Sequence, residues 1–374
     1  MHTSDPSPGI HRTMAPNGGF HSCNADVPQD APSRTRSTWK EISGRKIADR
    51  RTLLARWPQW YLRQEIPPDR KDVSSLPTSQ LTSRELEIVH RDATSLAEAL
   101  RNRRYTAVEV IKAFCHVAAI AQDLTNCLTE VMFEEGLRRA EELDKHMEET
   151  GEVVGPLHGV PVSIKDHILV KGHDTSTGYI AWAYKSVAVK DAVAVDILRR
   201  AGAVFYVKTA NPQTLLALET NNNVYGRTYN PFNRSTDRAY IALTPGGSSG
   251  GEGALIAVHG SPMGIGTDIG GRLVLGLYGL KGSVARMPHA GLMGSHDGMD
   301  AIVGALGPLA TSARDLALFC RVMLEHEPWL IEPALLEIPW KQSLAEGEGI
   351  PQGCQSQSCG TTGSSSRTHP YLML

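Results

Sequence analysis

The spacing of apolar positions along the chain predicts helices that alternate with short strands. A stripe of apolar residues at i, i+3 and i+4 spacing follows a capping box formed by Thr106 and Glu109, which predicts an amphipathic helix from about residue 107. Residues 133–149 predict a second helix, whose charged surface and thin apolar seam are typical of a solvated outer face. The segment from Asp191 to Gly202 predicts a third helix, followed at once by the strand AVFYVK.

Two further segments extend this pattern. Residues 159–164, GVPVSI, predict a strand that ends immediately before Lys165. Ser312 and Asp315 predict the start of a helix in the sequence TSARDLALFCRVML. Alternating helices and short apolar strands favour an α/β fold with helices packed over a sheet.

The two ends of the chain differ in composition from the middle. Residues 1–38 are rich in Pro, Ser, Asn and Gly and show little periodicity, so we expect a disordered leader. Residues 341–374 lack a hydrophobic repeat and predict a low-complexity tail. The expected folded domain therefore spans residues 39–340.

The charge balance and the cysteine content indicate which partners and which cellular compartment to expect. With 38 basic and 40 acidic residues, the chain offers no general attraction for nucleic acid or an anionic membrane. The sequence has no apolar run of bilayer length and no signal-peptide core, so we expect a cytoplasmic protein. Six cysteines without CxxC spacing predict free thiols, and 14 scattered histidines without metal-site spacing predict no metal site.

Candidate chemistry falls in three glycine-rich segments, which are residues 155–168, 243–258 and 260–271. In the first, Lys165 follows an apolar strand, where burial would lower its pKa and let it act as a general base; a plain surface charge is the alternative. In the second, Ser248 and Ser249 stand in a glycine loop before a helix. Ordinary helix capping is the alternative there, but a cap needs only one serine.

The third segment combines glycines with polar groups. Gly270 and Gly271 follow Asp268 and Ile269, and successive N–H groups at these positions would converge on a negative oxygen, as in an oxyanion hole. A tight turn from strand to helix is the alternative interpretation.

Taken together, these motifs resemble the amidase signature family. The resemblance covers about residues 40–330, is closest to fungal acetamidase-like members, and depends on the motifs GVPVSIKD, KTANPQT, PGGSSGGEGALIA and GIGTDIGG. It implies a mixed β-sheet flanked by helices, a small-molecule amide as substrate, and hydrolysis to a carboxylate and ammonia or an amine. It implies no cofactor, and it is compatible with a homodimer.

The resemblance also assigns roles to individual residues. It implies that Lys165 is the catalytic lysine and that Ser248 is the bridging serine in a cis peptide. Neutral Lys165 would accept a proton from Ser248, which would take one from a nucleophilic serine. The substrate and oxyanion region would be formed by Thr267, Asp268, Ile269, Gly270 and Gly271.

The sequence departs from the family pattern at three places. Family members continue GTDIGG with the nucleophilic serine, whereas this chain has Arg272, and a guanidinium cannot attack a carbonyl. The residues STDRAYI (235–241) are inserted, and low-complexity sequence replaces the family's C-terminal portion, so the sheet is expected to be incomplete at that end. A faulty gene model and a decaying gene both explain these departures.

Other interpretations of the same residues stay open. A catalytically inactive amidase-like pseudoenzyme would bind an amide or a partner without turnover. We do not expect Ser249 or Thr267 to replace the nucleophile, since either would have to reach both the relay and the oxyanion donors. The GGSSG sequence also fits an α/β-hydrolase elbow, which needs a strand directly before it. A phosphate-binding loop is a further alternative, but GxxxxGK is missing.

Overall fold

We analysed the chain in a computed structural model. It divides into two compact units, residues 1–37 and residues 38–374, and only the second holds described residues. The structure describes residues 38–67, 69–234, 244–268, 275–295, 298 and 303–345. The expected leader therefore lies outside the described residues except for Thr38, as does the expected tail after Ala345. The proposed domain boundaries stay predictions.

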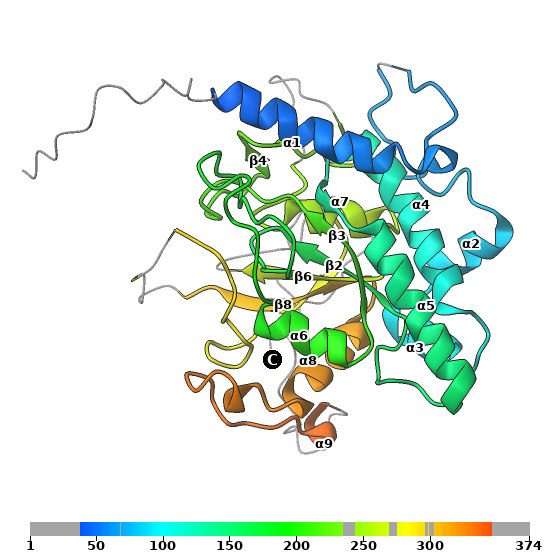
Figure 1. The fold of residues 1–374 in the computed structure, drawn as a ribbon, viewed down its shortest axis with the longest axis vertical. Coiled ribbons are helices and arrows are strands. Elements are labelled where there is room, and N and C mark those ends of the chain that lie inside the picture. Colours follow the sequence, from blue (N-terminus) through cyan, green and yellow to red (C-terminus); the bar gives the residue numbers. More distant parts are fainter. Residues whose placement is uncertain are drawn as a thin grey trace, which may run out of the picture. The chain divides into compact units, whose positions relative to one another are not determined.

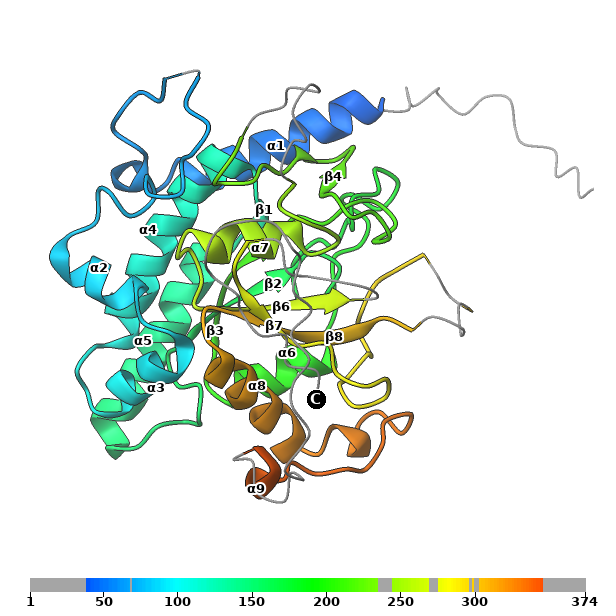
Figure 2. The same ribbon diagram turned by 180° about the vertical axis from the view of Figure 1, so that it is seen from behind.

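The described residues form helices and 3-10 turns in the order that Figures 1 and 2 show from two sides. The α-helices are α1 (Trp39–Leu54), α2 (Ser83–Val89), α3 (Ala93–Arg101), α4 (Ala107–Thr125), α5 (Phe133–Thr150), α6 (Val193–Arg200), α7 (Gly250–Ala257), α8 (Ala313–Glu325) and α9 (Gln342–Ala345). The two 3-10 turns are η1 (Pro58–Trp60) and η2 (Pro328–Leu330).

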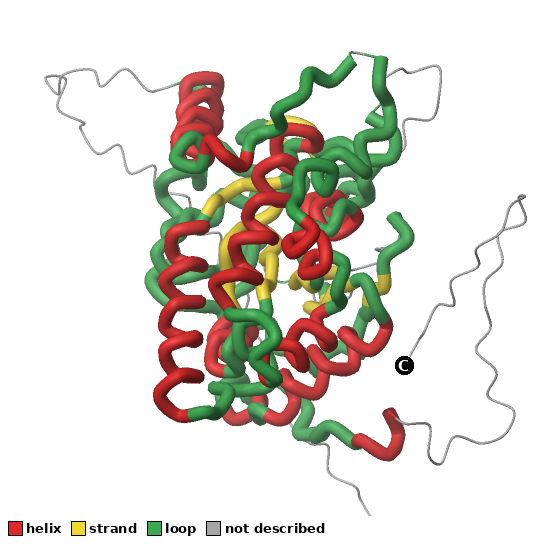
Figure 3. The backbone as a smooth tube through the Cα atoms, turned by 90° about the vertical axis from the view of Figure 1, so that its right-hand side faces the viewer, coloured by secondary structure: helices red, strands yellow, loops and turns green. Residues whose placement is uncertain are grey.

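A mixed sheet runs through the centre of this unit, with helices on both sides of it (Figure 3). Its strands, in spatial order, are β1 (Leu128–Val131), β3 (Val204–Thr209), β2 (Pro161–Lys165), β6 (Met263–Asp268), β8 (Ala305–Ala310) and β7 (Tyr278–Gly279). β2 pairs in parallel with β3 and β6, and the other pairings in this sheet are antiparallel. A separate hairpin joins β4 (Asn221–Asn222) and β5 (Gly226–Arg227). The mixed α/β class and the sheet flanked by helices are confirmed.

Where the sequence indicates a capping residue, at α4, α6 and α8, the helix begins there with one exception. At α4, the Thr106 side chain accepts a hydrogen bond from the Glu109 amide, and the Glu109 side chain bonds back to Thr106. The exception is α6, which we expected Asp191 to open. It begins two residues later, after Ala192, because the Asp191 carboxylate instead accepts hydrogen bonds from the Lys171 amide and from Arg199.

Burial of apolar faces explains how the helices are placed on the sheet. α4 and α5 pack against each other, and α5 packs on β3, where Gly136 lies close to the Tyr206 side chain. α7 contacts β2, β3 and β6, and the candidate serines immediately precede it. On the other side, Arg199 of α6 lies 5.0 Å from the centre of the Phe205 ring. The candidate segments are thus held between helices and the middle of the sheet.

Two smaller expectations concern cysteines and membrane helices. The described residues Cys115, Cys127 and Cys320 are free and buried, in agreement with the expectation of free thiols. Among the described helices, none combines the length and the apolar character that crossing a bilayer requires.

Candidate active site

Lys165 and Ser248 meet at the end of the central strand. Lys165 is the last residue of β2 and has no exposed surface, and its amine lies 2.6 Å from the Ser248 hydroxyl oxygen. Ser248 stands just before α7, and the Gly247–Ser248 peptide bond is cis. The strand and the loop thus bring together two side chains that are 83 positions apart in the sequence.

Thr267 is a second neighbour of the Lys165 amine. It lies near the end of β6, the strand next to β2, and its hydroxyl oxygen is 2.9 Å from the Lys165 amine. The Thr267 carbonyl accepts a hydrogen bond of 3.1 Å from the Ser249 hydroxyl. Ser249 is the N-cap residue of α7 but makes no side-chain capping bond, so helix capping does not explain this serine.

The loop before α7 does not fit an α/β-hydrolase elbow. Residues 244–249 contain no strand, so the strand that an α/β-hydrolase elbow places directly before its serine is not found in this described stretch.

Several glycines of the site are explained by close packing. A Cβ added to Gly250 would lie 2.3 Å from the Thr220 hydroxyl oxygen, and one added to Gly251 would lie 2.3 Å from the Ala210 amide nitrogen. The missing side chains let the start of α7 approach the loops that follow β3. This close approach holds Ser248 over the end of β2.

Glu252, on the first turn of α7, is a buried carboxyl group next to this site. It accepts hydrogen bonds from the Ser163 hydroxyl (2.5 Å) and from the Thr209 hydroxyl (2.8 Å). Burial raises the pKa of Glu252 to about 7, against the hydrogen bonds from Ser163 and Thr209 and the positive charge of Lys165. The site thus holds an acid that titrates near neutral pH.

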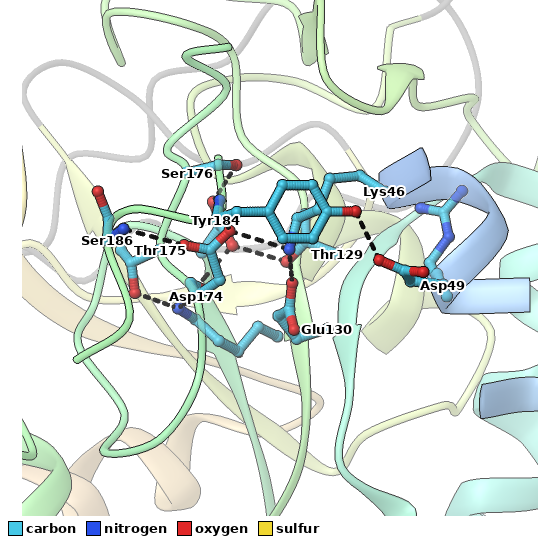
Figure 4. A network of polar contacts seen from close by, with 12 residues as sticks. Lys46, Asp49, Thr129, Glu130, Asp174, Thr175, Ser176, Tyr184 and Ser186 are labelled. Carbon is cyan, nitrogen blue, oxygen red and sulfur yellow. Dashed lines mark hydrogen bonds and ion pairs between the residues drawn. The ribbon is translucent and has the colours of Figure 1, made fainter. Parts of the chain in front are cut away.

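A buried network of charged groups joins α1 to the sheet and to the loop after β2 (Figure 4). The Lys46 amine forms ion pairs with Glu130 (2.7 Å) and Asp174 (3.0 Å). Although burial opposes it, these two carboxylates raise the pKa of Lys46 well above its ordinary value. Tyr184, in the same network, donates a hydrogen bond of 2.5 Å to Asp49.

A second fully buried lysine, Lys208, extends this network to the residue after Lys165. Its amine donates to the Thr175 hydroxyl (2.8 Å) and lies 3.9 Å from the Asp166 carboxylate. Burial lowers the pKa of Lys208, against the attraction of Asp166. Asp166 also accepts hydrogen bonds from the Thr129 hydroxyl and the Thr177 amide, both at 2.8 Å. These bonds fix the chain immediately after Lys165.

The structure brings together part of the predicted residue set. The Lys165 amine lies within hydrogen-bond distance of both the Ser248 and the Thr267 hydroxyl groups, and the backbone of Asp268 ends β6. Ile269, Gly270, Gly271 and Arg272 lie outside the described residues. The catalytic and oxyanion roles of all these residues stay predictions.

Comparison with known proteins supplies the family. The amidase family matches residues 109–347, which is more than half of the 374 residues. The chain belongs to the amidase family. This amidase-family chain is 41% identical over 317 residues to an acetamidase of Emericella nidulans, and 39% identical over 315 residues to an acetamidase of Aspergillus oryzae.

A solved structure agrees with this assignment. Fatty acid amide hydrolase superposes with a TM-score of 0.74 at 35% sequence identity, covering 81% of this chain and 55% of that chain. The two acetamidases match 83% and 82% of this chain but 56% and 55% of their own lengths. The chain therefore spans little more than half the length of these relatives.

Sequence reasoning overlooked Glu252 and the groups that hold it. The available signal was an acidic residue inside the otherwise apolar helix GGEGALIA. Its partners, Ser163 and Thr209, lie 89 and 43 positions away, so only the fold shows that the three side chains meet.

Proposed function

We propose that this amidase-family chain hydrolyses a small linear carboxamide to a carboxylate and ammonia or an amine. The observation that carries the proposal is the fully buried Lys165 amine, 2.6 Å from the Ser248 hydroxyl oxygen. The likeness to two acetamidases and to fatty acid amide hydrolase supports an amide as the substrate class.

The geometry suits a proton relay. A general base must lie within about 2.6 to 3.2 Å of the proton's carrier, and the distance between Lys165 and Ser248 falls in this range. In the proposed reaction, neutral Lys165 takes a proton from Ser248, and Ser248 takes one from the hydroxyl group that attacks the amide carbon. No side chain is assigned to that hydroxyl group, because Arg272 stands where the resemblance implies the nucleophilic serine. The C–N bond breaks as the relay returns a proton to the leaving ammonia or amine, and water then hydrolyses the acyl intermediate to the carboxylate.

The sequence after β6 favours a second candidate function. Arg272 follows GTDIGG, where the resemblance implies the nucleophilic serine. A chain with the relay but without this serine would be a catalytically inactive amidase-like protein that binds an amide or a partner.

Ammonia release from benzamide and acetamide tests the proposal. We expect the purified chain to release ammonia, and Lys165→Ala to lower the rate at least about 100-fold, the usual contribution of a general base. Lys145→Ala is the matched control, because its side chain is 73% exposed on α5. No release by the unmodified chain, together with calorimetric binding of benzamide, would favour the inactive protein. If the unmodified chain neither hydrolyses nor binds benzamide and acetamide, both the proposed hydrolysis and amide binding by an inactive protein are refuted.

A further inference from the structure

Glu252 bonds to the strand that carries Lys165 and to the next strand. Ser163 lies two residues before Lys165 on β2, so both side chains point to the same face of the sheet. Thr209 of β3 is the cross-strand neighbour of Lys165. Because Ser163 and Thr209 both donate hydrogen bonds to Glu252, the carboxyl group lies on the sheet face that holds the Lys165 side chain.

The neighbouring strand β6 leaves space for this carboxyl group. Gly264 pairs with Ser163, and a Cβ added there would lie 2.0 Å from the Glu252 Oε2 atom. A side chain at position 264 would therefore displace the Glu252 carboxyl group from its present position. The sequence of β6 is adapted to an acid at position 252.

The ionisable groups around Glu252 come from three strands or their flanks. Among the residues that the structure describes, they are Lys165 of β2, Tyr206 of β3 and Cys127, which precedes β1. Burial raises the pKa of the Tyr206 hydroxyl and raises that of the Cys127 thiol to about 12, so both stay neutral near pH 7. Lys165 is therefore the neighbour whose charge responds to Glu252.

We propose that Glu252 is a positioning residue for Lys165: its carboxylate, held on the sheet by Ser163 and Thr209, stabilises the charged form of the amine. It thereby sets the pH at which Lys165 is free to accept a proton from Ser248. The proposal rests on the proposed function, which gives Lys165 its role as a base.

Glu252→Gln tests this electrostatic role, because glutamine keeps the shape but removes the charge. The protonation of Lys165 is followed by NMR of lysine labelled with ¹³C at Cε, and the signal is assigned with Lys165→Met. We expect Lys165 to lose its proton at a pH lower by about one unit in Glu252→Gln, because an opposite charge has been removed. In the active enzyme, the acidic limb of the rate profile should move in the same direction by the same amount.

Asp315→Asn is the matched control. Asp315 is also a buried, hydrogen-bonded acid, which accepts from the Ala93 and Thr94 amides, and burial raises its pKa too. It joins α8 to α3, and we expect Asp315→Asn to leave the Lys165 titration unchanged. An equal shift in both variants would overturn the proposal.

Two results of the NMR titration would overturn the proposal. An unchanged Lys165 signal in folded Glu252→Gln would overturn the proposal, as would a Lys165 signal that does not move between pH 5 and 10 in either protein. If Glu252→Gln does not fold, Ser163→Ala is the substitute variant, because it keeps Glu252 but removes one hydrogen-bond donor that favours the charged carboxylate. We then expect a smaller shift of the Lys165 titration to lower pH. An unshifted Lys165 titration would overturn the proposal. Absence of turnover in the unmodified chain would refute hydrolysis, whereas the NMR titration still decides the role of Glu252.

Discussion

The Lys165 amine lies 2.6 Å from the Ser248 hydroxyl oxygen, at the end of a buried strand and at the start of a helix. Thr267 approaches the same amine from the adjacent strand. Close-packed glycines, a buried acid and a buried ionic network surround this pair of residues. We test each of these three features by a separate substitution.

Stability should depend on pH through Glu252. Its pKa is raised from 4.5 to about 7 in the folded protein, so the folded state binds more protons than the unfolded state between these values. The free energy of unfolding should therefore decrease as pH rises from about 4.5 to about 7, by about 3 kcal/mol, since each pKa unit corresponds to about 1.4 kcal/mol. Urea unfolding at pH 5 and pH 8 measures this difference. The slope should flatten in Glu252→Gln, and an identical slope in that variant would show that another group is responsible.

Gly264→Ala should destabilise the protein by at least about 2 kcal/mol. The added Cβ would lie 2.0 Å from the Glu252 Oε2 atom and 2.6 Å from the Ser163 hydroxyl oxygen, so these two buried side chains must be displaced and their hydrogen bond broken. Thermal or urea unfolding measures the loss. Gly44→Ala in α1 is the control, because nothing lies within 4 Å of its added Cβ, and it should stabilise by about 0.5 to 1 kcal/mol. Equal effects in the two variants would contradict the packing described here.

Lys46→Met should destabilise the protein by about 3 kcal/mol. Removing this amine leaves Glu130 and Asp174 without the cation that both contact in a buried position. Arg200→Ala provides the comparison, since its ion pair with Asp196 is half exposed on both sides and should contribute less than about 1 kcal/mol. Urea unfolding measures the free energy of unfolding of both variants. A Lys46→Met variant as stable as Arg200→Ala would contradict the stabilising role of the buried network.

An element could be predicted from the sequence where the residues that specify it are close together in the chain. Strand β2 and helix α4 could be predicted because their apolar spacing and capping residues are local. Helix α1 was not predicted, because its buried positions include Lys46 and Arg50 as well as Leu54. A hydrophobic repeat cannot identify a helix whose buried face is charged, and only the distant partners Glu130 and Asn126 explain that face.

The same reasoning applies to the site. Lys165 and Ser248 could be selected because each stands in a distinctive local motif. Glu252 could not, because an acid in a helix is ordinarily a surface residue, and its burial becomes visible only once Ser163 and Thr209 lie beside it.

The most direct test of the central claim compares ammonia release from benzamide by the unmodified chain, Lys165→Ala, Ser248→Ala and the double variant. If the two residues act as one relay, each single variant should lose at least about 100-fold in kcat/KM, and the double variant should lose no more than the worse single variant. Losses that multiply in the double variant, or single variants as active as the unmodified chain, would contradict the relay.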